Sequence, residues 1–303
     1  MNLSAIARPV LCVTGVACFI SFSVQTQAEQ PAPTSYRSGI LTGTDHRVPI
    51  SSDAWPWAAI GRVNVIQAAH HHHCTGTLIG ERQVLTAAHC VFDTRLNAWV
   101  KPQQVHFVAG QARDGTYQWH SVAVAIASDP NFRFAVEDHP GYDQIRMEMV
   151  ARDWAIITLA DVLNLKPISW QAVRNADLPK TGETDEIARA GYSQDRPFLL
   201  SVHRGCSVKT DVPKPGALMH RCDSMPGDSG SPILLLKDGA ASLVGIHTAI
   251  EQGFERGVGY RPISALGVSA STFAATATLA LEKTPDAGSL ERAATSDYAS
   301  PAR

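Results

Sequence analysis

The sequence predicts an all-β protein, and two observations carry this prediction. Short runs rich in β-branched and aromatic residues recur from Trp55 onward, and turn-forming residues separate them. This pattern is typical of β-sandwiches and β-barrels. Helical periodicity over about ten or more residues is nearly absent from the same part of the chain, which favours strands over helices.

Each expected strand has the length of a strand rather than of a helix and is bounded by turn residues. The last stretch, residues 265–303, is crowded with Ala, Ser and Thr, so we expect one short helix near residues 273–282 and a disordered end. The expected strands cover residues 58–66, 75–79, 83–87, 104–109, 117–127, 155–159, 186–192, 198–202, 232–236, 243–248 and 258–262.

Composition excludes several classes of protein. The chain has 303 residues, with 26 Lys and Arg against 28 Asp and Glu, so its formal net charge is −2. A protein that binds nucleic acid by neutralising phosphates carries a clear excess of basic residues, so we expect no nucleic-acid partner. The 45% of hydrophobic residues can form a sizeable core, which excludes disorder for most of the chain.

The first residues have the pattern of a secretory signal peptide. Arg8 precedes an apolar run over residues 10–24, and the segment Thr26-Gln27-Ala28 then has small residues at the positions that a signal peptidase reads. The run is shorter than the roughly 20 apolar residues of a membrane span, so we expect removal of residues 1–28 and no membrane partner afterwards. The mature protein would then be secreted or periplasmic. We expect residues 29–48 to be a propeptide or flexible lead-in, 49–263 the folded domain and 264–303 a tail.

Cysteine usage agrees with export. Four cysteines remain after removal of the signal peptide, and an even number in an exported chain predicts two disulfides. Three pairings are open to these cysteines. The C-x-x-C spacing of common zinc sites is absent, so a zinc site is not expected. The four residues are Cys74, Cys90, Cys206 and Cys222.

Three short segments together suggest acyl-transfer chemistry. His89 stands beside a cysteine at the end of an apolar run, Asp153 opens an apolar strand, and Ser229 lies between glycines before another strand. A weak hydroxyl nucleophile needs an imidazole to take its proton and a carboxylate to hold the imidazole tautomer. The backbone N–H groups of Gly227 and Ser229 are candidates for binding an oxyanion. Taken singly, each of the three side chains is compatible with a structural role.

The motifs around these residues resemble the trypsin/chymotrypsin-type serine peptidases, in the bacterial branch that includes the glutamyl endopeptidases. The order histidine, aspartate, serine is that of the family, and the resemblance covers roughly residues 40–263. The matching segments are CTGTLIG at residues 74–80, VLTAAHC at 84–90, DWAIITL at 153–159, CDSMPGDSGSP at 222–232 and LVGIH at 243–247.

The resemblance implies two packed six-stranded β-barrels with the active site in the cleft between them. His89, Asp153 and Ser229 would form the catalytic triad of a serine endopeptidase that hydrolyses protein or peptide substrates without a cofactor. The family pattern pairs Cys74 with Cys90, and Cys206 is then left to pair with Cys222.

The chain departs from trypsin in its activation signal. Trypsin members begin with Ile-Val-Gly-Gly, whose new amino group pairs with the aspartate before the nucleophile, and this tetrapeptide is absent here. Asp228 is nevertheless present. Two alternatives remain open: another new N-terminus reaches Asp228, for example after cleavage of a zymogen between Arg37 and Ser38, or an internal Arg or Lys replaces the amino group.

Two residues predict opposite substrate preferences. Asp223 lies six residues before Ser229, where trypsin-like enzymes place the carboxylate that selects Arg or Lys. His247 lies where glutamyl endopeptidases place a histidine that receives an acidic side chain, and we expect its protonation at lower pH to strengthen that preference. Thr248 and Gly257 are further candidates for the substrate pocket. The sequence favours His247 slightly.

Three other interpretations apply to these motifs: a metal site at the histidine run, an α/β-hydrolase and a catalytically inactive protein. The run His70 to His73 is expected to form a solvated loop, because alternate side chains of an extended segment cannot all face one metal ion. An α/β-hydrolase requires G-x-S-x-G with the serine before the acid and histidine, which this chain lacks. A catalytically inactive binding protein on a peptidase fold remains the alternative to an enzyme.

Overall fold

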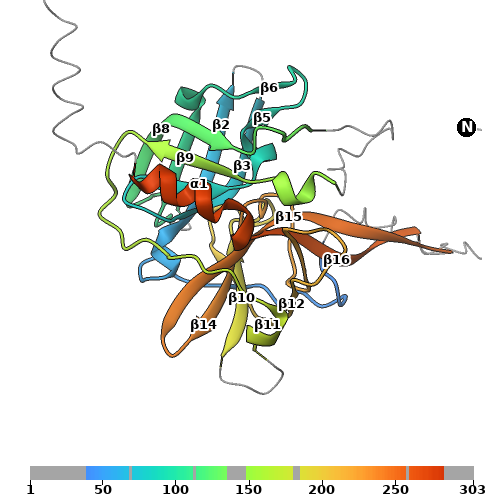
Figure 1. The fold of residues 1–303 in the computed structure, drawn as a ribbon. Coiled ribbons are helices and arrows are strands. Elements are labelled where there is room, and N and C mark those ends of the chain that lie inside the picture. Colours follow the sequence, from blue (N-terminus) through green and yellow to red (C-terminus); the bar gives the residue numbers. More distant parts are fainter. Residues whose placement is uncertain are drawn as a thin grey trace, which may run out of the picture. The chain divides into compact units, whose positions relative to one another are not determined.

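A computed structural model describes residues 39–67, 70–111, 114–134, 148–179, 185–256 and 259–282 (Figure 1). The expected signal peptide and the Arg37–Ser38 peptide bond lie outside the described residues. The prediction of an all-β fold is confirmed: strands make up most of the described chain, and one α-helix follows them.

The first half of the domain is a closed six-stranded barrel with strand order β2-β3-β4-β9-β8-β7. Neighbouring strands are antiparallel, and Ile60 pairs with Thr77 in the β2–β3 ladder. Apolar side chains fill the barrel because alternate residues of each strand point inward. The strands are β2 (Ile60–Gln67), β3 (His70–Leu78), β4 (Gln83–Thr86), β7 (Val105–Ala109), β8 (Trp119–Ser128) and β9 (Ala155–Leu159).

The second half is an eight-stranded antiparallel sheet with order β1-β11-β10-β14-β15-β16-β13-β12. It differs from the expected six-stranded barrel because two strands of two residues each, β1 and β12, occupy its edges. Strands this short carry no alternation that a sequence pattern could detect. The strands are β1 (Val48–Pro49), β10 (Glu186–Gly191), β11 (Ser201–Cys206), β12 (Val208–Lys209), β13 (Ala217–His220), β14 (Pro232–Lys237), β15 (Ala240–Glu255) and β16 (Gly259–Ser269).

Two short strands and five 3-10 helices lie between the longer strands in the described part of the chain. Two further strands, β5 (Phe92–Asp93) and β6 (Ala98–Trp99), pair with each other. The 3-10 helices are η1 (Trp57–Ala59), η2 (Ala88–Val91), η3 (Pro102–Gln104), η4 (Val150–Arg152) and η5 (Asn175–Asp177).

The C-terminal part of the domain continues beyond the expected boundary at residue 263. Strand β16 extends to Ser269, and the expected helix is present as α1 (Ala270–Glu282). Phe273 and Ala277 of this helix are fully buried in the core shared with the first barrel. Burial of its apolar face explains why α1 is part of the domain rather than a separate tail.

The expected lead-in is also partly folded. Gly39 pairs with Ser224 through an isolated antiparallel bridge, and Arg47 is buried. The boundary expected between residues 48 and 49 therefore falls inside β1, which pairs with β11.

Disulfides join Cys74 to Cys90 and Cys206 to Cys222, the pairs that the family resemblance implies. The first links strand β3 to helix η2, and the second links the end of β11 to the segment before Ser229. None of the helices in the described part of the chain is long and apolar enough to cross a membrane.

Candidate active site

His89 and Asp153 form a doubly hydrogen-bonded pair. The His89 backbone N–H donates to Asp153 Oδ1 at 2.9 Å, and the ring Nδ1 lies 2.7 Å from Oδ2. Asp153 is fully buried. A carboxylate at this nitrogen favours the tautomer with the proton on Nδ1, which gives Nε2 a free electron pair that can accept a proton.

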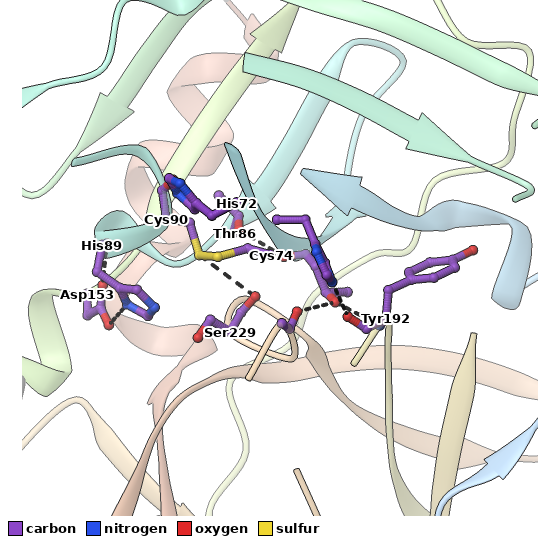
Figure 2. The surroundings of a disulfide bond; sticks show 11 residues. His72, Cys74, Thr86, His89, Cys90, Asp153, Tyr192 and Ser229 are labelled. Atoms are coloured by element: carbon purple, nitrogen blue, oxygen red, sulfur yellow. Dashed lines mark hydrogen bonds and ion pairs between the residues drawn. A yellow bond between two sulfur atoms is a disulfide. The ribbon is translucent and has the colours of Figure 1, made fainter. Parts of the chain in front are cut away.

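Ser229 lies in the turn before β14 and shares one cavity with His89. The cavity has a volume of about 720 Å³. Figure 2 shows the His89 ring between the Asp153 carboxylate and the Ser229 side chain. Among the described residues no hydrogen bond joins His89 Nε2 to Ser229 Oγ. Such bonds are often long in unliganded enzymes and tighten when substrate binds.

The first barrel holds the Ser229 backbone in place. The Thr75 N–H donates to the Ser229 carbonyl at 2.9 Å. Sγ of Cys90 lies 3.8 Å from the same oxygen (Figure 2). The Cys74–Cys90 disulfide therefore packs directly against the residue that the sequence predicts to be the nucleophile.

Gly227 has a backbone conformation that requires glycine. Its φ is +95°, and a Cβ there would lie 2.7 Å from His73 Nε2 and from the Tyr192 carbonyl oxygen. In the described part of the chain, the backbone N–H groups of Gly227 and Ser229 donate to no protein acceptor. Both can therefore donate to an oxygen atom of a ligand.

Thr75 connects strand β3 to this turn. Its hydroxyl donates to the Gly227 carbonyl at 3.0 Å and accepts the Tyr192 N–H at 2.9 Å. Thr75 is fully buried, and its own carbonyl accepts the Thr86 hydroxyl at 2.8 Å. One side chain of the first barrel thus fixes the orientation of the peptide group that follows Gly227.

Asp228 forms an ion pair with an internal arginine. Arg189 Nη1 lies 2.6 Å from Asp228 Oδ1, and both side chains are fully buried. The other carboxylate oxygen accepts the Ser193 hydroxyl at 2.8 Å and the Met225 N–H at 2.7 Å. Of the two alternatives that the sequence left open for Asp228, the structure contains the internal cation.

His247 and Thr248 line the same cavity as His89 and Ser229. The Cys222 N–H donates to His220 Nδ1 at 3.2 Å, so the proton of a neutral His220 lies on Nε2. That nitrogen lies 3.0 Å from His247 Nδ1, which therefore accepts. The proton of a neutral His247 then lies on its other nitrogen, Nε2.

Burial keeps this histidine pair neutral. It lowers the pKa of His220 to about 3, with the positive charges of Arg189 and His203 as smaller causes. Burial also lowers the pKa of His247 well below its usual range, with His220, Arg189 and His89 contributing. The expected protonation of His247 at mildly acidic pH is not supported, because a cation there would be desolvated and unpaired.

Asp223 lies away from this cavity. It is fully buried, and its carboxylate accepts the backbone N–H groups of Leu41 at 2.9 Å and His46 at 3.0 Å, with His46 Nδ1 at 2.9 Å. These hydrogen bonds occupy the Asp223 carboxylate, which the sequence predicted as a candidate for selecting Arg or Lys in the substrate. The remaining pocket candidate, Gly257, lies outside the described residues.

The family assignment follows from a family model. The model described as "Trypsin" matches residues 46–266, which is most of the chain. The chain belongs to the trypsin family. The match includes the closed barrel, the eight-stranded sheet except for the end of β16, and every residue of the candidate triad.

Curated relatives of the trypsin-family domain include active and inactive proteins by name. Serine protease 23 of Mus musculus is 30% identical over 53% of this chain and 42% of its own length, so the chain spans less than half of that relative. "Inactive serine protease PAMR1" of Bos taurus is 29% identical over 54% of this chain and 22% of its own length. CLIP domain-containing serine protease B10 of Anopheles gambiae is 24% identical over 75% and 68% of the two chains.

Two solved structures share the fold. A Glu endopeptidase in complex with MPD has a TM-score of 0.58 at 21% identity and covers 80% of this chain and 100% of its own. An inactivated protease paralogue of the scabies mite has a TM-score of 0.56 at 17% identity and covers 78% and 99%. These similarities support the chymotrypsin-like fold of the domain.

The histidine run belongs to strand β3 of the trypsin-family domain rather than to a loop. His72 lines the cavity, and its Nε2 lies 3.1 Å from the Cys90 carbonyl oxygen. His73 Nε2 lies 3.0 Å from the Tyr192 carbonyl oxygen, and burial lowers the pKa of His73. These positions of His72 and His73 differ from the expected solvated loop, although the alternation of strand side chains next to Cys74 could have indicated them.

Two groups of residues in the described part of the chain have metal-ligand spacing. In each group, bonds within the protein already occupy potential ligand atoms. One contains Cys74, His89 and Cys90, whose sulfur atoms form a disulfide. The other contains His46, His203 and Asp223. Its His203 Nδ1 accepts the Asp223 N–H at 2.8 Å, which occupies the electron pair that a metal would need.

Proposed function

We propose that this trypsin-family protein is a secreted serine endopeptidase in which Ser229 is the nucleophile, His89 the general base and Asp153 the residue that orients His89. One observation carries the proposal: the buried Asp153 binds His89 through two hydrogen bonds, and His89 and Ser229 line one cavity. The two disulfides support export, because disulfides persist in oxidising compartments.

In the proposed reaction, His89 Nε2 takes the proton of Ser229 Oγ while Oγ bonds to the carbonyl carbon of the scissile peptide. The carbonyl oxygen becomes an oxyanion and accepts the N–H groups of Gly227 and Ser229. The imidazolium of His89 then gives its proton to the leaving amine as the C–N bond breaks, which leaves an acyl-enzyme. Water repeats the sequence, with His89 as base, and releases the carboxylic acid and free Ser229.

Within this function, we propose an acidic preference at the residue whose carbonyl is attacked. A neutral His247 with its proton on Nε2 can donate a hydrogen bond to a substrate carboxylate. The Thr248 hydroxyl already donates to the Leu266 carbonyl at 3.3 Å. Asp223 is unavailable as a basic-specificity determinant because backbone N–H groups and His46 occupy it. An acidic substrate side chain would therefore find a hydrogen-bond donor in the pocket, His247 Nε2.

Labelling of Ser229 tests the proposed function. A fluorophosphonate should label the wild-type protein at Ser229, and Ser229→Ala should abolish both labelling and peptide cleavage. Ser51→Ala is the matched control, because Ser51 is exposed and does not line the cavity. Peptide cleavage by Ser229→Ala at the wild-type rate would exclude the mechanism.

The comparisons with inactive proteases favour a catalytically inactive binding protein as the second candidate. In that case the wild-type protein would neither react with the fluorophosphonate nor cleave any member of a peptide library. It would still bind peptides in the cavity beside His89 and Ser229, with an affinity that Ser229→Ala leaves unchanged.

A further inference from the structure

The segment of residues 39–47, called here the N-terminal strap, is fixed next to the nucleophile turn. At its start, Gly39 and Ser224 exchange two backbone hydrogen bonds of 2.9 and 3.1 Å. Further on, the strap donates the N–H groups of Leu41 and His46 to the buried Asp223 carboxylate. These contacts attach the strap to the residues that lead into the turn around Ser229.

Arg47 is the last residue of the strap, and its side chain is buried. Its Nη1 donates to the Ser193 hydroxyl oxygen at 2.7 Å and to Asp195 at 3.1 Å, and its Nε donates to Asp45 at 2.9 Å. Burial opposes ionisation of Arg47, but the hydrogen bonds to Asp45 and Asp195 outweigh burial and raise the pKa of the guanidinium above its usual range. Arg47 is therefore a permanent cation.

The hydrogen bonds run in one direction from Arg47 to Asp228. Arg47 donates to Ser193, so the Ser193 hydroxyl is free to donate its own proton, and it does so to Asp228 Oδ2 at 2.8 Å. Charge assistance at both ends strengthens such a chain in a buried environment. Arg189 contacts the other oxygen of the same carboxylate, so two arginines fix Asp228 from two directions.

We propose that Arg47 is a positioning residue that acts through Ser193 to fix the Asp228 carboxylate, and with it the backbone from Gly227 to Ser229. The inference rests on the proposed function, because the positioned groups are the nucleophile and the two oxyanion donors. The strap is then a working part of the peptidase rather than a segment removed for activity.

A positioning role of Arg47 can be distinguished from a purely structural role by comparison with Arg196. Arg196 belongs to the same ionic group, since its Nη2 donates to Asp45 at 2.8 Å and its Nη1 donates to the Arg47 carbonyl at 3.2 Å. Among the described contacts, however, the Arg196 side chain has none with Ser193 or Asp228. The Arg196 backbone N–H donates to the Ser193 carbonyl at 3.0 Å, and a substitution of the side chain keeps that bond. Arg196→Met therefore weakens the attachment of the strap while the chain from Arg47 to Asp228 stays intact.

The experiment compares Ser193→Ala, Arg47→Met, Arg47→Lys and the control Arg196→Met in the full-length protein. We measure kcat and KM on one peptide substrate, the rate of fluorophosphonate labelling and the thermal unfolding midpoint. Ser193→Ala and Arg47→Met should lower kcat about tenfold to a hundredfold with KM within about twofold. That loss lies below the roughly 10²- to 10³-fold cost of removing an oxyanion donor itself.

Arg47→Lys should restore part of kcat, because an ammonium can still donate to Ser193. Arg196→Met should keep the wild-type kcat, even if its unfolding midpoint falls. Ser193→Ala keeps Arg47 paired with Asp45 and Asp195, so it preserves the fold if Arg47→Met does not. A wild-type kcat and labelling rate in Ser193→Ala would overturn the inference, as would an equal loss in Arg196→Met. Failure of the wild-type protein to react would instead overturn the proposed function.

Discussion

Arg189 and Asp228 form an ion pair that is closed off from solvent on both sides, with Arg189 Nη1 2.6 Å from Asp228 Oδ1. A buried ion pair contributes little net stability when intact, but removal of one partner leaves an uncompensated charge. The pair lies next to Ser229 and joins two side chains, so the cationic partner of Asp228 in this structure is not a chain terminus.

Removal of the cation should destabilise the protein strongly. We expect Arg189→Met to lower the free energy of unfolding by about 3–5 kcal/mol, because the Asp228 carboxylate would remain buried and unpaired. Urea denaturation measures this loss. The double variant Arg189→Met with Asp228→Asn should recover part of it, and additive losses from the two substitutions would show that the pair is not coupled.

Replacement of the orienting acid should remove activity and preserve the fold. Asp153→Asn should lower kcat about 10⁴-fold at neutral pH, because an amide favours the wrong tautomer of His89. Peptide cleavage and circular dichroism measure the two properties. Asp161→Asn is the control, since Asp161 accepts the Ser121 hydroxyl at 2.8 Å and does not line the cavity. An equal loss in the control variant would reassign the acid.

The hydroxyl of Thr75 should matter more than its methyl group. Thr75→Val keeps the shape of the side chain but removes the bonds to Gly227 and Tyr192. The peptide group between the two proposed oxyanion donors is then held less firmly, so kcat should fall about tenfold. Thr75→Ser keeps the hydroxyl and should retain most of kcat. Steady-state kinetics at a temperature well below the unfolding midpoint measures kcat of both variants. An equal kcat for Thr75→Val and Thr75→Ser would contradict the prediction.

The substrate pocket should favour glutamate over glutamine and arginine at the residue whose carbonyl is attacked. On peptides that differ only at the residue whose carbonyl is attacked, His247→Ala should reduce kcat/KM for glutamate selectively, because the donor to the carboxylate is lost. Asp223→Ala should leave the order of preference unchanged and lower stability, since its bonds attach the N-terminal strap. Loss of arginine cleavage in Asp223→Ala alone would make the enzyme trypsin-like.

Acid should destabilise the fold through the buried histidines. Below the usual pKa of 6.5 the unfolded chain binds a proton at His220, whereas the folded protein does so only near its own pKa of about 3. Stability is therefore fully present above pH 6.5 and decreases as pH falls toward 3, by about 1.4 kcal/mol per pH unit for each such group. Urea denaturation at several pH values in this range should show that the free energy of unfolding of His220→Gln depends less steeply on pH than that of the wild-type protein.

The sequence by itself determined the fold class, the strands of the first barrel and the three residues of the proposed triad. Alternation and turn residues are local, so they indicated β9 at residues 155–159 with the bounds that the structure has. The motifs around His89 and Ser229 indicated chemistry because each combines a reactive side chain with the small neighbours that its turn requires.

Only the tertiary structure decided what surrounds those residues. Asp223 and His247 were both candidates along the chain, with a slight preference for His247, and the tertiary structure placed His247 at the cavity and Asp223 against the N-terminal strap. The partner of Asp228 lies 39 residues away in sequence, and Arg47 lies still further. Such ion pairs depend on which buried charges the fold brings within about 3 Å of each other, and no periodicity in the sequence encodes that distance.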